Sequence, residues 1–420
     1  MFIVNWWKKL SWTVKISWSK NACLPLLAAS VLIKWKVFFK NVPLIWDVIT
    51  MLEIMGSLWV TYEFVDDTLF LDSSNLSLDN FLAHRIKEIR ASILLLSPIL
   101  HFFDKITIPE PGGCNIWKRS IDSHLEWLKT IWYSYKIGED NTIEISWNKE
   151  YWDKNINASF WVTWTENLII ANVLRRWQTV IRLAAIEPHV INLIDFLKLA
   201  WADIVVDYDH TITINWVDNL NSNLWFNVVS DYIESGTFMI IWAMLAREYI
   251  DIENARIKDL YAFIEKLKEA WVRIEDMWDD KVRVWRSTNL KAVSIQTNIF
   301  PGFPTDLQSP FSVLMTQAEW ISKIHEVLFE SRLNFLVELE KIKWHVAILN
   351  PHEALIFWKT NVKAGETLTS WDLRAWVAMV IIALLIEWET KITNINYIKR
   401  GYSNFLEKII SLWGDIREEE

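Results

Sequence analysis

The sequence predicts an α/β fold built from six repeats of about 70 residues. Two observations predict it: six tryptophans recur at nearly constant spacing, and helix-like and strand-like segments alternate around each of them. The six lie 69 to 73 residues apart and are Trp59, Trp132, Trp201, Trp271, Trp344 and Trp413. Each follows an apolar helix-like stretch and precedes a short strand-like one. Each repeat is therefore expected to run strand, helix, strand, helix and then two further strands.

A second recurring pattern supports the repeat. Four segments read as a helix end, a turn and an alternating strand, and they cover 31–42, 173–184, 245–256 and 384–395. Solenoid units are shorter, at about 20–50 residues, so a period near 70 suits a small unit with two helices. We expect six units of the βαβαββ type.

The length of 420 residues suits two domains of about 200 residues, with three repeats each. We expect one domain over 20–229. The strand-like N-terminus is expected to complete the other domain, which then joins 1–19 to 230–420. The chain would cross between the domains twice, near 19–21 and 228–231.

Tryptophan is unusually frequent and glycine unusually rare: the chain has 29 Trp and 9 Gly, where average usage predicts about thirty Gly. The six repeated Trp stand at the helix C′ position, where the backbone often turns left-handed and glycine is preferred. Any other residue there costs about 1–2 kcal/mol. We interpret most of these Trp as stand-ins for Gly, from a gene in which UGA encodes Gly and was read as Trp. We expect most of the six to have positive φ.

Composition narrows the class of protein. The net charge of −9 argues against nucleic-acid binding through a global basic field. Two cysteines argue for a reducing compartment and against a disulfide scaffold. The N-terminus lacks the order of a signal peptide, and the longest apolar run, 377–386, is too short to span a bilayer. We expect a soluble cytoplasmic protein.

Motifs for metals and cofactors are absent. The eight His are scattered, and the sequence contains neither Cys-x-x-Cys nor His-Glu-x-x-His, nor a Walker or dinucleotide-binding fingerprint. We therefore expect no metal and no cofactor.

Two candidate site segments lie in the first domain. Lys20 and Asn21 stand at a strand-to-helix junction, where a helix N-terminus with a Lys suits an anion. An exposed Lys at a helix start is the alternative. Cys114 follows Pro-Gly-Gly in an open loop with Lys118 and Arg119 close behind, and nearby cations lower the pKa of a thiol. A buried, unreactive Cys is the alternative there.

Two further segments lie in the second domain. Asp306 sits in a Pro-rich turn before a helix, where Asp is most often an N-cap. Asp372, Arg374 and Arg400 lie at the starts of apolar helices, where Arg normally avoids the positive dipole end and often serves an anionic ligand. The sequence thus predicts a small polyanion in a cleft between the domains. The basic residues available to it are Lys20, Arg90, Arg119, Arg374 and Arg400.

Seven segments carry a resemblance that covers nearly the full chain. They are SWSKNACLP (17–25), RASILLLSP (90–98), PGGCNIWKR (111–119), TWTEN (163–167), FPTDLQ (303–308), DLRAW (372–376) and KRGY (399–402). In these segments the chain resembles the UDP-N-acetylglucosamine 1-carboxyvinyltransferase family. The resemblance implies a two-domain inside-out α/β barrel with three βαβαββ units in each domain.

The resemblance also implies a reaction. The enolpyruvyl group of phosphoenolpyruvate moves to the 3-hydroxyl of UDP-N-acetylglucosamine with release of phosphate, the first committed step of peptidoglycan synthesis. The implied partners are these two small molecules, with no metal, nucleic acid or membrane.

Roles follow for the matched residues. Cys114 would protonate the enol carbon and could form a covalent adduct, Asp306 would take the proton of the sugar hydroxyl, and Asp372 would stabilise the charged intermediate. The implied catalytic residues are Cys114, Asp306, Lys20, Asp372 and Arg400. The implied substrate-binding residues are Lys20, Asn21, Arg90, Arg119, Ser120, Ile121, Asp122, Ser123, Asp306, Leu328, Arg374 and Arg400.

Three alternatives remain. A 5-enolpyruvylshikimate-3-phosphate synthase-like enzyme would share the fold, but the cysteine loop and TWTEN favour the UDP-sugar reaction. An inactive paralogue that only binds ligands would not need the matched catalytic residues. A Trp-rich carbohydrate-binding module would need rings on one face of a strand pair, whereas these Trp follow helix ends.

Overall fold

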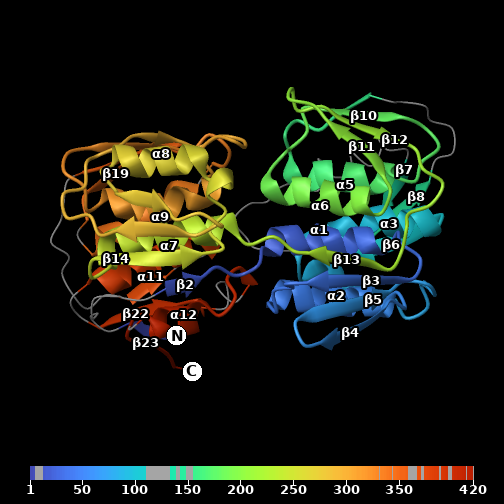
Figure 1. The fold of residues 1–420 in the computed structure, drawn as a ribbon, viewed down its shortest axis with the longest axis horizontal. Coiled ribbons are helices and arrows are strands. Elements are labelled where there is room, and N and C mark those ends of the chain that lie inside the picture. The colour runs from blue at the N-terminus through green and yellow to red at the C-terminus, as the bar shows by residue number, and fades with distance from the viewer. Residues whose placement is uncertain are drawn as a thin grey trace. The chain divides into compact units, whose positions relative to one another are not determined.

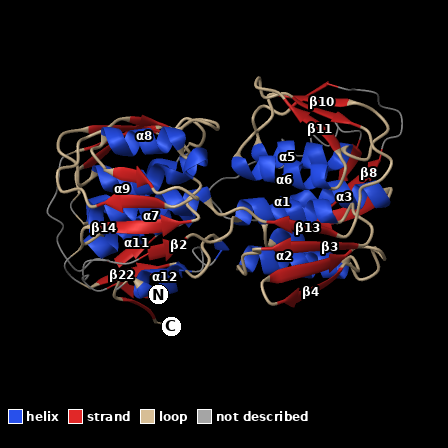
Figure 2. Ribbon diagram, in the orientation of Figure 1, coloured by secondary structure: helices blue, strands red, loops and turns tan. Residues whose placement is uncertain are grey.

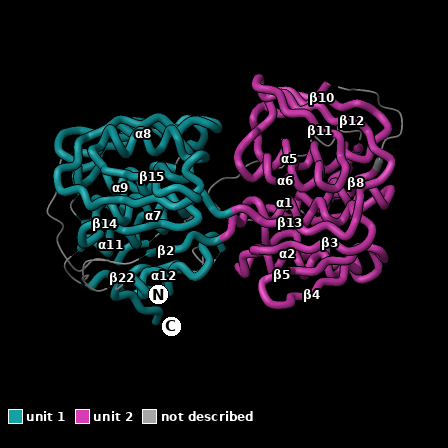
Figure 3. Tube along the Cα trace, viewed as in Figure 1, with its two compact units in different colours: residues 1–17, 230–420 teal, residues 18–229 magenta. Residues whose placement is uncertain are grey.

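The computed structural model describes residues 1–4, 13–109, 133–138, 142–147, 155–330, 332–342, 344–357, 367–369, 373–386, 389–395, 400–412 and 414–419. The chain divides into two compact units (Figure 3). Unit 1 joins residues 1–17 to 230–420, and unit 2 contains residues 18–229.

Unit 2 is coloured blue to green in Figure 1. Its described strands are β3 (Lys36–Lys40), β4 (Thr61–Val65), β5 (Thr68–Asp72), β6 (Lys105–Pro109), β7 (Tyr133–Ile137), β8 (Thr142–Trp147), β9 (Asn155–Asn157), β10 (Thr179–Arg182), β11 (Asp203–Val206), β12 (Ile212–Asn215) and β13 (Leu224–Asn227). Its described helices are α1 (Lys20–Ser30), α2 (Trp46–Ser57), α3 (Leu96–Phe102), α5 (Val162–Asn172) and α6 (Pro188–Leu199), with the 3-10 helices η1 (Ala83–Lys87) and η2 (Arg90–Leu95).

Unit 1 begins with two strands and continues after the chain returns from unit 2. Its described strands are β1 (Phe2–Val4), β2 (Thr13–Lys15), β14 (Tyr249–Glu253), β15 (Ile274–Asp276), β16 (Val282–Trp285), β17 (Ile295–Gln296), β18 (Ser322–His325), β19 (Val346–Asn350), β20 (Glu353–Ile356), β21 (Thr367–Thr369), β22 (Thr390–Thr393) and β23 (Ile416–Glu418). Its described helices are α7 (Tyr232–Leu245), α8 (Tyr261–Glu269), α9 (Gln308–Met315), α10 (Leu336–Lys341), α11 (Leu373–Leu385) and α12 (Phe405–Ser411), with the 3-10 helices η3 (Ile257–Asp259), η4 (Thr305–Leu307) and η5 (Arg332–Phe335).

Five sheets of the described chain share one strand arrangement. An edge strand pairs in parallel with a central strand, and two more strands follow, each antiparallel to its neighbour. The orders are β13-β3-β5-β4, β9-β10-β12-β11, β2-β14-β16-β15, β17-β18-β20-β19 and β21-β22-β1-β23. The sixth sheet has the described strands β6-β8-β7. One βαβαββ pattern thus repeats along the chain, which confirms the repeat predicted from the Trp spacing.

Buried helices such as α7 and α9 lie inside their unit with sheets around them (Figure 2), whereas α2 and α8 are partly exposed. In unit 1, α7, α9 and α11 contact one another, and each also packs on its own sheet. All residues of α7 and α9 are buried, because helices that are apolar on every side need protein contacts all round. Gly236 of α7 allows a close approach: a Cβ there would lie 2.5 Å from Leu307 Cδ1. This approach seats η4, which contains Asp306, against the central helix.

The turns after α2, α6 and α8 contain three of the repeated tryptophans. Trp59, Trp201 and Trp271 have φ values of 69°, 72° and 65°. The residue after each Trp donates its N–H to the carbonyl five residues earlier, as in a Schellman motif. The left-handed C′ position predicted from the sequence is therefore confirmed for these three.

Three more tryptophans, Trp35, Trp278 and Trp320, also have positive φ. Each of the six left-handed Trp is at least 51% exposed, so none of these rings is buried in a core. The side chains therefore add little packing energy to offset the strain of their backbone.

Trp344 corrects the predicted repeat. It is only 3% exposed, and its N–H donates to the carbonyl of Leu339. After α2, α6 and α8 that bond is made by the residue after the left-handed position, so this Trp stands one residue later than predicted and packs in the core of unit 1. The predictions for Trp132 and Trp413 lie outside the described residues.

Candidate active site

Lys20 and Asn21 open helix α1 in unit 2. Ser19 is the N-cap and its Oγ accepts a hydrogen bond from the Ala22 N–H. Lys20 is largely buried, at 16% side-chain exposure, and its Nζ lies 3.2 Å from Asp47 Oδ2 in the first turn of α2. The exposed helix-start alternative is therefore wrong: Lys20 is a partly buried cation with a carboxylate partner beside a helix N-terminus.

Burial shifts the pKa of two other residues of unit 2, Arg90 and Cys23. Arg90 is the first residue of η2 and is half-buried, and this burial lowers the pKa of its guanidinium. Cys23 is buried in α1, and burial raises the pKa of its thiol. Cys23 is therefore the unreactive kind of cysteine.

Iodoacetamide is expected to leave Cys23 unmodified in the folded protein, because the buried thiol is neither accessible nor ionised. Peptide mass spectrometry after a short treatment at pH 7.5 measures this directly. The same treatment in denaturant is the control and should label Cys23. Equal labelling in the folded and the denatured chain would contradict its burial.

Several predicted site residues lie outside the described residues. They are Cys114, Arg119, Ser120, Ile121, Asp122, Ser123 and Asp372.

Asp306 lies in η4 between two arginines. Arg332 Nη2 donates to Asp306 Oδ1 at 2.6 Å. Arg374 donates to Oδ2 through Nε at 3.0 Å, and its Nη2 lies 2.9 Å from the same oxygen. The two guanidiniums come from η5 and from the start of α11, so the fold brings together three segments that are far apart in the sequence.

This geometry replaces the N-cap interpretation of Asp306. The N-cap of η4 is Pro304 and that of α9 is Leu307, and both carboxylate oxygens of Asp306 are engaged by arginines. Burial alone would raise the pKa of Asp306, but Arg374 and Arg332 outweigh it and hold the pKa well below its usual range. Asp306 is therefore ionised at neutral pH.

Arg374 is buried at 4% exposure. Burial would lower the pKa of its guanidinium, but the nearby Asp306 raises it. The guanidinium carbon lies 5.3 Å from the centre of the Tyr402 ring, and Nη1 has no hydrogen-bond partner among the described residues. Arg374 was predicted from its place at a helix start, and the structure places it in contact with Asp306.

A fully buried acid, Glu326, bonds to the chain around Leu328. Glu326 is 0% exposed, and its Oε1 accepts hydrogen bonds from the N–H groups of Leu328 at 3.0 Å and Phe329 at 3.2 Å. Its Oε2 accepts from Thr305 Oγ1 at 2.7 Å. Leu328 and Asp306, two predicted substrate contacts, are thus joined through one carboxylate.

Arg400 lies in unit 1 ahead of α12 and is half-buried. The predicted site residues that the structure describes therefore belong to both units. Unit 2 contains Lys20, Asn21 and Arg90, and unit 1 contains Asp306, Leu328, Arg374 and Arg400.

The sequence reasoning missed Arg332 and Glu326. Arg332 begins η5, just ahead of α10, so the signal that singled out Arg374, an Arg at a helix start, was present there too. Glu326 follows β18 and carries no comparable signal, since its burial arises from contacts with Thr297 and Thr305.

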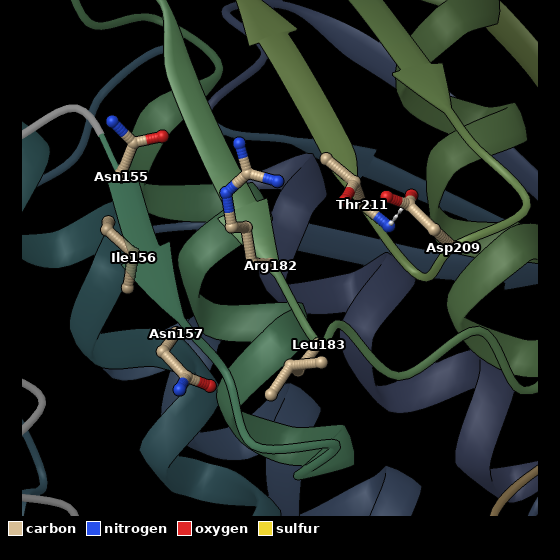
Figure 4. Close-up of a pocket in the computed structure, with 7 residues that line it drawn as sticks. All are labelled: Asn155, Ile156, Asn157, Arg182, Leu183, Asp209 and Thr211. Atoms are coloured by element: carbon tan, nitrogen blue, oxygen red, sulfur yellow. Dashed lines mark hydrogen bonds between the residues drawn. The ribbon is translucent and has the colours of Figure 1, made fainter.

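A hollow of about 340 Å³ lies elsewhere, in unit 2 (Figure 4). Asp209 and Thr211 form one side, with Asp209 Oδ1 accepting from the Thr211 N–H at 3.1 Å. Its lining residues are Asn155, Ile156, Asn157, Arg182, Leu183, Asp209 and Thr211. None of these is a predicted site residue.

The described part of the chain contains neither a membrane-spanning helix nor a metal-binding cluster. No described helix has the length and apolarity needed to cross a membrane. No group of three or more His, Cys, Asp and Glu is arranged to hold a metal ion among those residues.

The sequence matches the family described as EPSP synthase (3-phosphoshikimate 1-carboxyvinyltransferase) over residues 4–409. UDP-N-acetylglucosamine 1-carboxyvinyltransferase 1 of Legionella pneumophila is 34% identical over 412 residues, which cover 98% of this chain and 81% of that protein. UDP-N-acetylglucosamine 1-carboxyvinyltransferase of Desulforapulum autotrophicum is 33% identical over 415 residues, covering 98% and 97%.

Solved structures show the same fold. The enolpyruvyl transferase NikO from Streptomyces tendae superposes with a TM-score of 0.90 at 20% identity, covering 99% of this chain and 98% of that one. EPSP synthase from Acinetobacter baumannii gives a TM-score of 0.71 at 13% identity, covering 99% of each chain. At these identities the likeness concerns the fold alone, and it confirms the predicted inside-out α/β barrel.

Proposed function

The chain belongs to the EPSP synthase family of carboxyvinyltransferases, and we propose that it transfers the enolpyruvyl group of phosphoenolpyruvate to the 3-hydroxyl of UDP-N-acetylglucosamine, releasing phosphate. The observation that carries this proposal is identity of 33–34% over nearly the whole chain to proteins named for the UDP-sugar reaction. The reaction would open peptidoglycan synthesis, and we propose that it takes place in the cytoplasm.

In this proposal the anionic groups of phosphoenolpyruvate are bound by cations. Lys20, Arg119 and Arg400 hold the phosphate and carboxylate, together with Arg374. Support comes from Lys20 at the N-terminus of α1, where a helix favours anions, and from Nη1 of buried Arg374, which has no hydrogen-bond partner among the described residues. Cations fixed before the reaction stabilise the charge that develops on the leaving phosphate.

Two groups move protons. The Asp306 carboxylate takes the proton of the sugar 3-hydroxyl as that oxygen bonds to C2 of the enolpyruvate, and the Cys114 thiol gives its proton to C3. The product of this addition is a tetrahedral ketal. Loss of a proton from C3 with departure of phosphate from C2 then gives the enolpyruvyl ether. The support for Asp306 as base is that its environment keeps it ionised.

The remaining proposed residues bind and stabilise. Asp372 stabilises the charged intermediate, and Cys114 forms a covalent adduct with the three-carbon unit. The UDP-sugar is contacted by Asn21, Arg90, Arg119, Ser120, Ile121, Asp122, Ser123, Asp306 and Leu328.

The purified chain is expected to release phosphate from phosphoenolpyruvate when UDP-N-acetylglucosamine is present. With shikimate 3-phosphate in its place, release should stay at the background rate. A continuous phosphate assay measures both, and a version with Gly at the six left-handed Trp positions should show the same preference. Turnover with shikimate 3-phosphate alone would assign the EPSP synthase reaction instead, and binding of both substrates without turnover would indicate an inactive paralogue.

A further inference from the structure

A chain of hydrogen bonds in unit 1 connects buried Glu326 to the proposed base. Glu326 Oε2 accepts from Thr305 Oγ1 at 2.7 Å, and Thr305 Oγ1 lies 2.7 Å from Arg332 Nη1. Arg332 Nη2 then donates to Asp306 Oδ1 at 2.6 Å. Arg332 is only 8% exposed at its side chain, so these bonds lie in a largely dry environment where they are strong.

The direction of every bond in this chain is determined by chemistry. A guanidinium only donates, and an ionised carboxylate only accepts. The single hydroxyl proton of Thr305 therefore goes to Glu326, and its oxygen accepts from Arg332. One nitrogen of Arg332, Nη1, is thus connected through Thr305 to the buried carboxylate of Glu326, and the other, Nη2, donates to Asp306.

Arg374 is held differently. It donates to Asp306 Oδ2 and also hydrogen-bonds the Tyr402 hydroxyl, while its Nη1 lacks a partner among the described residues. Apart from Asp306, its partners differ from those of Arg332, which donates to Thr305. Arg374 can therefore change its partner without breaking the chain of bonds that fixes Arg332.

Asp306 Oδ2 already has two donor atoms of Arg374 against it, whereas Oδ1 accepts one hydrogen bond, from Arg332. We propose that Arg332 is a positioning residue that keeps Asp306 oriented through Oδ1, while Arg374 transfers its hydrogen bonds from Oδ2 to the anionic substrate. This inference rests on the proposed roles of Asp306 and Arg374. Arrival of the anion then frees Oδ2 and removes one cation from Asp306, which makes Asp306 a stronger base.

Glu326, the buried acid of this chain of hydrogen bonds, also contacts Leu328, the proposed sugar contact. Glu326 Oε1 accepts from the Leu328 N–H at 3.0 Å and from Thr297 Oγ1 at 2.9 Å, and the Val327 N–H donates to Thr297 Oγ1. The segment that would bind the sugar and the carboxylate that would deprotonate it are thus fixed to the same buried acid. Positioning of Asp306 is therefore tied to positioning of the sugar hydroxyl.

The charged and titratable groups around Asp306 come from each element packed against it. They are Arg332 of η5, Arg374 of α11, Asp231 at the N-cap of α7 and, beyond Arg374, Tyr402. Burial raises the pKa of Asp231 and of Tyr402. A carboxyl and a phenol are never cationic, so neither side chain could replace the positive charge of Arg332.

The test compares R332M and R332K with the unmodified chain in phosphate-release kinetics over a range of pH. R332M is expected to lower kcat at least tenfold, change the KM for phosphoenolpyruvate less than about threefold, and move the acid limb of kcat up by about one to three pH units. The shift is upward because loss of a cation lets Asp306 protonate at higher pH. R332K should restore part of kcat and most of the pH profile. R283Q, which removes an arginine paired with Asp251 elsewhere in unit 1, is the matched control and should leave both unchanged.

A second pair of variants tests the connection from Arg332 through Thr305 to Glu326 without removing a charge. T305V removes the hydroxyl that connects Arg332 to Glu326, and T305S keeps that hydroxyl. T305V should lose about three- to tenfold in kcat and T305S less than twofold. This pair decides the matter if R332M does not fold. The proposal is overturned if R332M keeps the acid limb of the parent, if its loss lies entirely in the KM for phosphoenolpyruvate, or if T305V and T305S behave alike. Absence of turnover in the unmodified chain would instead refute the proposed function.

Discussion

Replacing the six left-handed tryptophans by glycine is expected to stabilise the protein by roughly 3–6 kcal/mol in total. A side chain in the left-handed region costs about 1–2 kcal/mol, and the greater freedom of Gly in the unfolded chain returns about half of that. Each of these Trp is at least half exposed, so its removal forfeits less buried area than removal of a core ring does. The substitutions are W35G, W59G, W201G, W271G, W278G and W320G.

The six tryptophans divide equally between the two units, so the effect on urea unfolding can be measured for each unit separately. Residues 35, 59 and 201 belong to unit 2, and residues 271, 278 and 320 belong to unit 1. Each triple variant should raise the urea midpoint of its own unit without changing the slope of the transition. The control is W242G, which removes a fully buried ring from the middle of α7 and should cost about 3–5 kcal/mol. If the two triples destabilise as W242G does, these Trp are genuine and do not stand in for Gly.

Substitution of Asp306 by asparagine is expected to lower kcat by about 10²- to 10⁴-fold, the range for loss of a general base. The amide keeps the volume of the side chain but cannot accept the proton of the sugar hydroxyl. The KM for phosphoenolpyruvate should not rise, because Arg332 and Arg374 both remain to attract anions. Phosphate-release kinetics at saturating concentrations of both substrates separate the two constants.

D306N also leaves two arginines without their shared carboxylate, so its stability must be measured beside its activity. D259N is a suitable control, because Asp259 also pairs with an arginine, Arg256, and both side chains of that pair are partly buried in the same unit. D259N should keep kcat within about twofold. A D306N protein that is folded and retains more than a tenth of the parent kcat would remove Asp306 from the role of base.

Signals that are local in sequence predicted the repeat well. A helix end followed by a left-handed residue occupies a few consecutive positions, so the Trp at 59, 201 and 271 could be recognised from their neighbours alone. The same pattern misplaced the turn at Trp344, because it does not distinguish a residue in the turn from the residue after it. Burial decides between the two, and Trp344 lies in a core.

The cluster at Asp306 shows what such reasoning could not supply. Asp306 and Arg374 were each singled out from local context, but nothing in their spacing says that they touch. Arg332 completes the cluster from a third segment, and Glu326 acquires its role only through the hydroxyl of Thr305. These contacts depend on how η4, η5 and α11 pack, which is a property of the folded unit.

The strand pairings of unit 1 have a consequence for how the protein is made. Strand β1 pairs with β22 and β23, so Val4 cannot form its strand pairs until Thr390 and Ile416 have been synthesised. A ribosome that adds about 5–20 residues per second delivers β22 roughly 20–80 seconds after β1. Unit 2 is complete on the nascent chain during that interval, while β1 and β2 still lack their partners. Unpaired strand edges invite association with other chains, so the first fifteen residues are the segment that a nascent-chain chaperone is expected to bind.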